Sequence, residues 1–354
     1  MGSISEEYIL SEEQKAHFLE HGYVKIPQCF TREAAAKFTE GMWTRLGMSP
    51  TDKSTWTTEK TNMPWHYHVS VSEFSPKAWS AMGQLLGGVD RISEKPGFRG
   101  WSDGFIVNLG REGYSGEQEL NLRCSSAGTS RKALLTPVAL DNWHNDGDFF
   151  VHFLDSPEQA LLVIPLWSDI VHKGGATAIC GDGIKYIAKH LVFLFTPSFG
   201  LVSDKCRYDH PEGTTPWMRS VNDPTHSRYE GRDFWSQIAW DPSKTRDESF
   251  HEATGEVGDV FLLHPLMLHS ASKNLLRIPR IITNPPVSLK EPFNFDREDP
   301  SEYSLVELKT LKDLGMSEGL KGWKITGPRR EWVSNRIKRQ EAERLKELER
   351  LKGQ

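Results

Sequence analysis

The chain has 354 residues, with 43 Lys and Arg against 48 Asp and Glu, and its formal net charge is −5. This mild acidity argues against a nucleic-acid-binding protein, which needs a basic surface. The longest apolar run, residues 160–167, is far shorter than the roughly 20 residues of a membrane-spanning helix. Four scattered cysteines predict neither a disulfide framework nor a zinc ribbon. Without a secretory signal pattern at the N-terminus, we expect a cytoplasmic protein.

The N-terminal region predicts helices within residues 9–42. Ser11 and Gln14 have the spacing of a capping box, and Gly22 is a typical helix end. Residues 23–27 alternate like a short strand, and residues 31–42 predict a second helix. Residues 50–100 are mixed and rich in tryptophan.

The centre of the chain consists of short strand-like runs separated by turn signals, which is typical of a barrel or sandwich. These runs are residues 104–109, 160–167, 175–180 and 280–283, with a further apolar run at 260–269.

We expect a single domain, in which a helical and mixed region (1–100) precedes a β core (101–290) and a helical extension (291–354). Residues of about 200–250 are polar and aperiodic and predict an insertion that acts as a lid. The charged tail from residue 328 onward predicts a solvated helix packed along one edge. A dimerisation or partner helix is the alternative, and a dimerisation helix would make the protein a homodimer.

The most informative segment contains His144, Asn145 and Asp146. In an extended chain, side chains at i and i+2 point to the same face, so His144 and Asp146 can converge on one point. An imidazole and a carboxylate are two of the three ligands in the facial triad of non-heme iron(II) oxygenases.

The third ligand must come from a distant strand, and His264 and His269 are the candidates. They are five residues apart, so on a regular strand they face opposite sides and only one can point inward. Arg280 lies eleven residues after His269 and suits bidentate binding of a carboxylate. This spacing favours His269 over His264, although Arg277 competes with Arg280.

Together these segments resemble the phytanoyl-CoA dioxygenase (PhyH-like) family of Fe(II)/2-oxoglutarate-dependent oxygenases. The resemblance covers residues of about 10–285. It rests on the N-terminal helix and strand, the His144 to Asp146 segment, the run from Gly174 to Ile179, and residues 258–264 continuing to His269 and Arg280.

The resemblance implies a mainly β fold with flanking helices, built on a double-stranded β-helix (a jelly-roll or cupin-like barrel). It implies that His144, Asp146 and His269 hold Fe(II) and that Arg280 binds the distal carboxylate of 2-oxoglutarate. Asn142 and Thr177 match positions that contact this co-substrate in relatives.

The activity implied is oxidation of a small-molecule metabolite by O2, through hydroxylation, desaturation or cyclisation, while 2-oxoglutarate is decarboxylated to succinate. A related halogenase would carry a small residue in place of Asp146. The alternatives are a barrel that only binds a small molecule and a metal-dependent isomerase. The chain departs from the family at residues 181–184, where relatives usually carry Pro-Gly-Ser-His.

Other residues have plainer interpretations. His66 and His68 form a second i, i+2 pair but lack a carboxylate, and we interpret them as structural or pocket-lining. Asp148 shares a face with Asp146 and is a weaker candidate ligand. The aromatic residues that belong either to the core or to a pocket are Phe149, Phe150, Trp65, Trp101 and Trp143.

Overall fold

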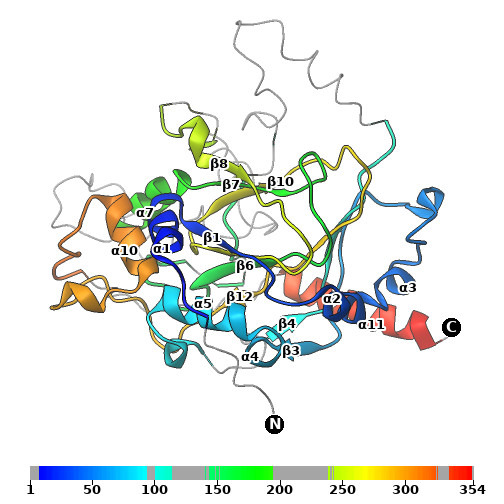
Figure 1. The fold of residues 1–354 in the computed structure, drawn as a ribbon, viewed down its shortest axis with the longest axis horizontal. Helices are drawn as coiled ribbons and strands as arrows, with labels where there is room; N and C mark the ends of the chain where they lie inside the picture. The colour runs from blue at the N-terminus through cyan, green and yellow to red at the C-terminus, as the bar shows by residue number, and fades with distance from the viewer. Residues whose placement is uncertain are drawn as a thin grey trace, which may run out of the picture.

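The fold places β-sheets at the centre, with helices flanking them (Figure 1). A computed structural model describes residues 8–93, 100–113, 140, 143–147, 149–150, 152–193, 238–239, 241, 243–323, 325 and 335–352. The predicted mainly β core with helices is found. The strands described form separate sheets and close no barrel, so the double-stranded β-helix stays a prediction.

Every pair of strands in these sheets is antiparallel. The sheet orders are β1-β9-β6-β12, β10-β7-β8, β11-β5-β2 and β3-β4. The strands are β1 (Tyr23–Ile26), β2 (Lys60–Asn62), β3 (His68–Ser70), β4 (Gly100–Ser102), β5 (Ile106–Asn108), β6 (Leu161–Pro165), β7 (Thr177–Cys180), β8 (Phe250–Glu252), β9 (Val260–Leu263), β10 (Leu268–Ala271), β11 (Arg280–Ile282) and β12 (Pro286–Val287).

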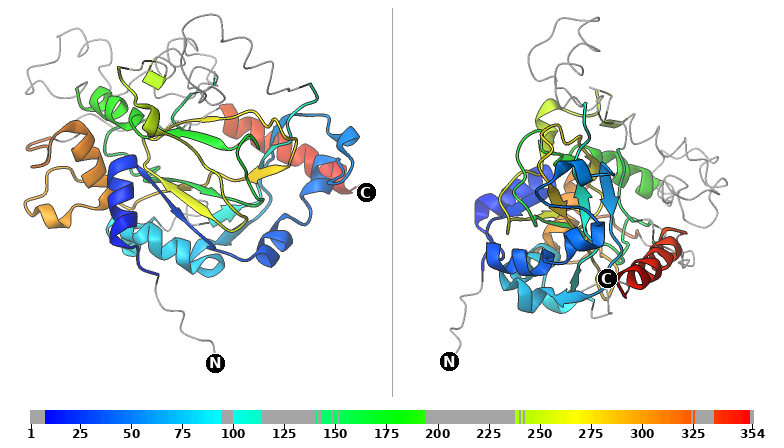
Figure 2. Two further views of the ribbon diagram at one scale, coloured as in Figure 1. Left: turned by 45° about the horizontal axis from the view of Figure 1, so that its top comes forward. Right: turned by 90° about the vertical axis from the view of Figure 1, so that its right-hand side faces the viewer.

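The helices gather around the sheets, with α1, α7 and α10 at one end and α2, α3 and α11 toward the other (Figures 1 and 2). The α-helices are α1 (Glu12–His21), α2 (Arg32–Thr39), α3 (Met42–Leu46), α4 (Val71–Phe74), α5 (Pro76–Leu86), α7 (Gly183–Phe193), α10 (Leu305–Leu314) and α11 (Asn335–Lys352). Short 3-10 turns are η1 (Lys53–Thr55), η2 (Val89–Arg91), η7 (Asp247–Ser249) and η8 (Pro300–Glu302).

The N-terminal helix forms as predicted. The Ser11 hydroxyl accepts from the backbone N–H of Gln14, and the Gln14 side chain accepts from the backbone N–H of Ser11. Gly22 ends the helix at φ 74°, a left-handed conformation that glycine adopts without a steric penalty. The second predicted helix also forms, with Thr31 as its N-cap, but it ends at Thr39 rather than at residue 42, and α3 begins after Gly41.

The predicted strands appear within a few residues of their expected bounds, with one exception that matters for the site. The apolar run 260–269 is two strands, β9 and β10, joined by a turn in which Met267 N–H donates to His264 O at 2.9 Å. Pro265 within this turn has no N–H to donate to a ladder, so a continuous strand is disfavoured there. The turn sends the chain from one sheet into another.

A large part of the aromatic content is structural. Phe38 stacks on Trp167 at 4.4 Å between ring centroids, and Phe30 and Trp101 contact the same indole. Edge and offset contacts of this kind add to the apolar area that the rings bury. The aromatic excess therefore reflects a ring cluster in the core, of which Trp101 is a buried member.

The charged tail is helical, as predicted, from Asn335 to Lys352. It packs on the domain through an ion pair between Glu347 and Arg45 at 2.6 Å, and the Arg344 guanidinium lies over the Trp65 ring. Among the described residues, no helix is long and apolar enough to cross a membrane.

Candidate metal centre

Two of the predicted ligands are neighbours on paired backbone segments. His144 and His269 exchange both backbone hydrogen bonds, with N···O distances of 2.9 and 3.0 Å. Residues opposed in this way present their side chains on the same face of a sheet. The two imidazole centroids accordingly lie only 4.3 Å apart.

The third predicted ligand completes a compact group. Asp146 follows His144 by two residues, and its Oδ1 lies 3.6 Å from His144 Nε2, while its Oδ2 lies 3.5 Å from His269 Nε2. One ligand atom from each of the three residues lies within 4.8 Å of the others. The structure therefore brings His269 next to His144 and Asp146, although His269 follows Asp146 by 123 positions in the sequence.

A backbone carbonyl orients the His269 ring. His269 Nδ1 lies 3.0 Å from Met267 O, and because a carbonyl only accepts, Nδ1 carries the proton. Nε2, which lies 3.5 Å from Asp146 Oδ2, is then the nitrogen that the neutral ring can offer to a metal. Metal-binding histidines are typically fixed by a hydrogen bond of this kind on the other nitrogen.

Asp146 and His269 shift each other's pKa values. Burial by itself would raise the pKa of Asp146, but the adjacent His269 and His144 rings hold it well below its ordinary value. Burial likewise opposes the charged form of His269, yet Asp146 raises its pKa overall. A cation between these side chains would replace the proton that they share.

The predicted carboxylate-binding arginine is buried next to the same sheet face. Arg280, 3% exposed, donates from Nη2 to Thr177 Oγ1 at 2.9 Å. Thr177 opposes Ala271, two residues beyond His269 on β10, so Thr177 and His269 share one face of the β7–β10 pair. Diagonal neighbours of this kind lie about 7–8 Å apart.

Arg280 has no acidic partner among the residues that the structure describes. Its Nε is buried without a hydrogen bond, and its Nη1 has only a long contact of 3.5 Å to Ile106 O. Burial lowers its pKa to about 10, so the guanidinium is still charged at neutral pH. A buried cation without a paired anion is costly unless a ligand supplies the negative charge.

His264 and Arg277, the alternatives to His269 and Arg280, make their contacts elsewhere. His264 is fully buried, where its Nδ1 accepts from Leu266 N–H and its Nε2 lies 2.9 Å from Thr310 Oγ1 on α10. Both of its nitrogens are thus engaged away from Asp146. Arg277 lies over the Trp56 ring and reaches Lys53 O.

The other histidine pair lies elsewhere. His66 Nε2 is 3.7 Å from Glu347 on α11, and His68 packs against Trp65, which is 39% exposed. Trp143 is buried against Phe250, and Phe149 contacts Phe150. Asn142, Asp148 and most of the predicted insertion at 200–250 lie outside the described residues.

Three carboxamides near the ligands were not predicted from the sequence. Asn284 Nδ2 donates to Asp146 Oδ2 at 3.0 Å, Gln159 Nε2 lies 3.3 Å from Asp146 O, and Asn145 Nδ2 donates to Pro265 O at 3.0 Å. No motif marks these residues. Only the position of Asn145, between two predicted ligands, indicated that its side chain lies near the site.

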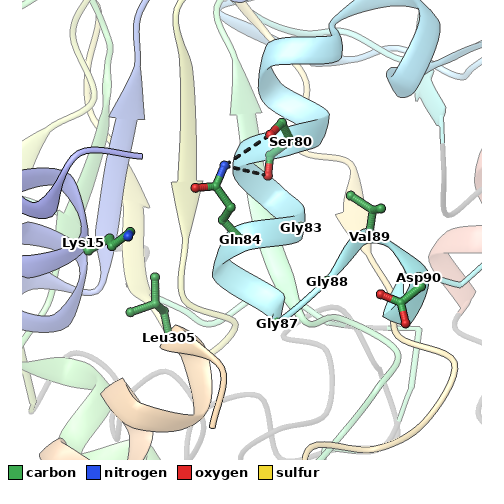
Figure 3. Close-up of a pocket in the computed structure, with 9 residues that line it drawn as sticks. All are labelled: Lys15, Ser80, Gly83, Gln84, Gly87, Gly88, Val89, Asp90 and Leu305. Carbon is green, nitrogen blue, oxygen red and sulfur yellow. Dashed lines mark hydrogen bonds between the residues drawn. The ribbon is translucent and has the colours of Figure 1, made fainter. Parts of the chain in front are cut away.

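A surface pocket of about 610 Å³ lies apart from these residues, between α1, α5 and α10 (Figure 3). Gln84 on its wall is engaged with Ser80 and with the backbone of Tyr8 and Leu10, and Lys15 pairs with Glu12. None of the predicted site residues lines this pocket.

The chain matches no family model and no curated protein. Solved structures with some likeness include SnoK, a non-heme alpha ketoglutarate dependent carbocyclase from nogalamycin biosynthesis, at 15% identity and TM-score 0.36 over 90% of this chain and 94% of that one. HygX from Streptomyces hygroscopicus, solved with nickel and 2-oxoglutarate bound, has 14% identity and TM-score 0.36 over 82% and 91%. EvdO2 from Micromonospora carbonacea var. aurantiaca has 12% identity and TM-score 0.37 over 80% and 95%. Likenesses this distant establish neither family nor activity, so the interpretation of the site rests on its own geometry.

Proposed function

We propose that the protein is an Fe(II)/2-oxoglutarate-dependent oxygenase that oxidises a small-molecule metabolite. The observation that carries this proposal is the convergence of His144, Asp146 and His269 within 4.8 Å. Two imidazoles and one carboxylate form the ligand set of non-heme iron(II) oxygenases, which leaves further metal positions for a co-substrate and O2.

The residues present fit both Fe(II) and 2-oxoglutarate. The protonated Nδ1 of His269 leaves Nε2 as a metal ligand, and Asp146 offers an oxygen from the same face. Arg280 and Thr177 offer a guanidinium and a hydroxyl, which suit the distal carboxylate of 2-oxoglutarate. Iron with 2-oxoglutarate and O2 supplies the oxidising power, and 2-oxoglutarate ends as succinate and carbon dioxide.

The protein's own contribution is placement. The paired backbone of His144 and His269 sets the spacing of two ligands, and Arg280 would set the orientation of the co-substrate. The side chains of His144, Asp146 and His269 are 20, 15 and 7% exposed, so they are largely shielded from solvent without being fully enclosed. Orientation and control of solvent are what a protein adds to cofactor chemistry.

We further propose that the chain is a PhyH-like enzyme with one domain built on a double-stranded β-helix. The sheet β10-β7-β8, extended by the bridge to His144, supports this architecture because it carries the ligands as such a core would. Within that scheme, Asn142 stays a proposed co-substrate contact and residues 200–250 a proposed lid. We also propose that the protein forms a homodimer.

An anaerobic titration tests the proposed function without a known substrate. Purified protein is loaded with Fe(II), 2-oxoglutarate is added, and the visible charge-transfer absorption of the chelate is followed. We expect this absorption in the wild type and its loss in His144→Ala, because one ligand is removed. Absence of the absorption in the wild type, or its persistence in His144→Ala, would contradict the proposal.

The same preparations distinguish oxidation from simple binding. On admission of O2, an oxygenase forms succinate from 2-oxoglutarate, and candidate metabolites should increase the rate. A protein that only binds a small molecule would form the chelate but no succinate. An isomerase would turn over its substrate without either O2 or 2-oxoglutarate.

A further inference from the structure

The side chain of Asp146 receives one hydrogen bond from a carboxamide that comes from a distant segment. Asn284 Nδ2 donates to Asp146 Oδ2 at 3.0 Å across 138 positions of sequence. It is the only hydrogen-bond donor other than the two histidines that the structure gives to this carboxylate among the residues it describes. When His144 and His269 hold a metal through Nε2, neither can donate to Asp146, and Asn284 alone remains.

The segment that carries Asn284 is held on both sides. Before it, Ile281 N–H donates to Ser168 Oγ, and Thr283 Oγ1 accepts from the Trp167 indole N–H. After it, Pro286 and Val287 form β12 against β6. The following residue is Pro285, which restricts the backbone of Asn284 to extended conformations.

The amide engages Oδ2, the oxygen that faces His269, while Oδ1 faces His144 and receives no hydrogen bond from Asn284. We propose that Asn284 is a positioning residue that holds Asp146 so that only one of its carboxylate oxygens serves as a metal ligand. This inference rests on the proposed function, because it assigns a role toward the same metal.

The consequence concerns the co-substrate. A carboxylate that used both oxygens would take an additional metal position, and 2-oxoglutarate needs two positions for its own chelation. Asn284 also follows Arg280 by four residues, on the same short segment. One rigid piece of chain thereby fixes the carboxylate ligand of the metal and the guanidinium proposed for the co-substrate.

Asn284→Leu tests the role, because leucine keeps the approximate shape and removes the donor. Binding of Co(II) in the absence of 2-oxoglutarate is measured by calorimetry, together with the visible Co(II) spectrum. We expect Co(II) affinity to fall about 10–100-fold, as for other residues that support metal ligands. The spectrum should also change shape, and Asn284→Gln should restore part of both properties because it retains the carboxamide.

Two controls separate this inference from the proposed function. If the wild type binds Co(II) and His144→Ala does not, the result supports a metal site at His144. Should Asn284→Leu then bind Co(II) within twofold of the wild type with an unchanged spectrum, Asn284 has no positioning role. If His144→Ala binds Co(II) as the wild type does, the proposed function fails instead. Circular dichroism of each variant verifies that a loss of binding does not come from unfolding.

Discussion

At the residue scale, the clearest functional signal is the charge of Arg280. It is buried and donates to Thr177, and its Nε has no partner. Arg277, three residues earlier, is partly exposed, and its guanidinium lies over the Trp56 ring. The two arginines therefore form a natural pair for comparison, since both belong to the same part of the chain.

Arg280→Gln should weaken 2-oxoglutarate binding by at least about tenfold, because charge-assisted bonds to a carboxylate contribute roughly 1.5–3 kcal/mol. Titration of 2-oxoglutarate into the metal-loaded protein measures this effect. Arg277→Gln serves as the control and should bind 2-oxoglutarate as the wild type does. Equal weakening in both variants, or in neither, would remove Arg280 from the co-substrate site.

At the scale of elements, the turn at residues 264–267 decides how the candidate metal centre is built. It ends β9 in one sheet and starts β10 in another, where His269 meets His144. On one continuous strand His264 and His269 would face opposite sides, but residues 264–269 are not one strand. His269 does lie at the centre, but the reason is the turn, which leaves His264 packed against α10.

An ion pair between Glu347 and Arg45 holds helix α11 on the domain. Glu347 and Arg45 have side chains only 11 and 8% exposed, and Arg45 also pairs with Asp103 at 2.8 Å. Glu347→Ala leaves part of a buried guanidinium without its partner, so we expect a loss of about 1–3 kcal/mol in the free energy of unfolding. Denaturant titration measures the loss.

Glu349→Ala on the same helix is the matched control, since Glu349 is exposed. Limited proteolysis should also cleave near α11 sooner in Glu347→Ala than in this control. An unchanged stability of Glu347→Ala would mean that the ion pair does not hold α11 on the domain.

At the scale of the whole molecule, stability should depend on pH through His264. Desolvation by burial lowers its pKa to about 3, whereas a histidine in an unfolded chain titrates near about 6.5. Between these values the unfolded chain binds the additional proton, so stability falls as the pH drops from about 6.5 toward 3. His264 by itself contributes about 2 kcal/mol to the loss between pH 7 and pH 5, and the buried His152, whose pKa burial lowers to about 4, adds to it.

Unfolding curves at pH 7 and pH 5 check this expectation. His264→Gln is less stable at pH 7 but should lose about 2 kcal/mol less on acidification than the wild type. Thr310→Val removes the partner of His264 Nε2 and keeps the titrating ring, so its loss on acidification should match the wild type. Identical losses in the wild type and His264→Gln would show that His264 does not govern this part of the pH dependence.

The sequence by itself determined what depends on near neighbours. The cap at Ser11, the left-handed end at Gly22 and the common face of His144 and Asp146 follow from local backbone geometry, which a few adjacent residues set. The strand runs that the sequence predicted, except residues 260–269, were placed to within a few residues for the same reason.

Only the tertiary structure decided the contacts that join distant segments. The pairing of His144 with His269, the partner of Arg280 and the approach of Asn284 to Asp146 each depend on strand register and on one turn. Register follows from the simultaneous packing of many buried side chains, and no short stretch of sequence contains that information. The identity of the candidate ligands was therefore accessible from the sequence, whereas the residues that hold them in place were not.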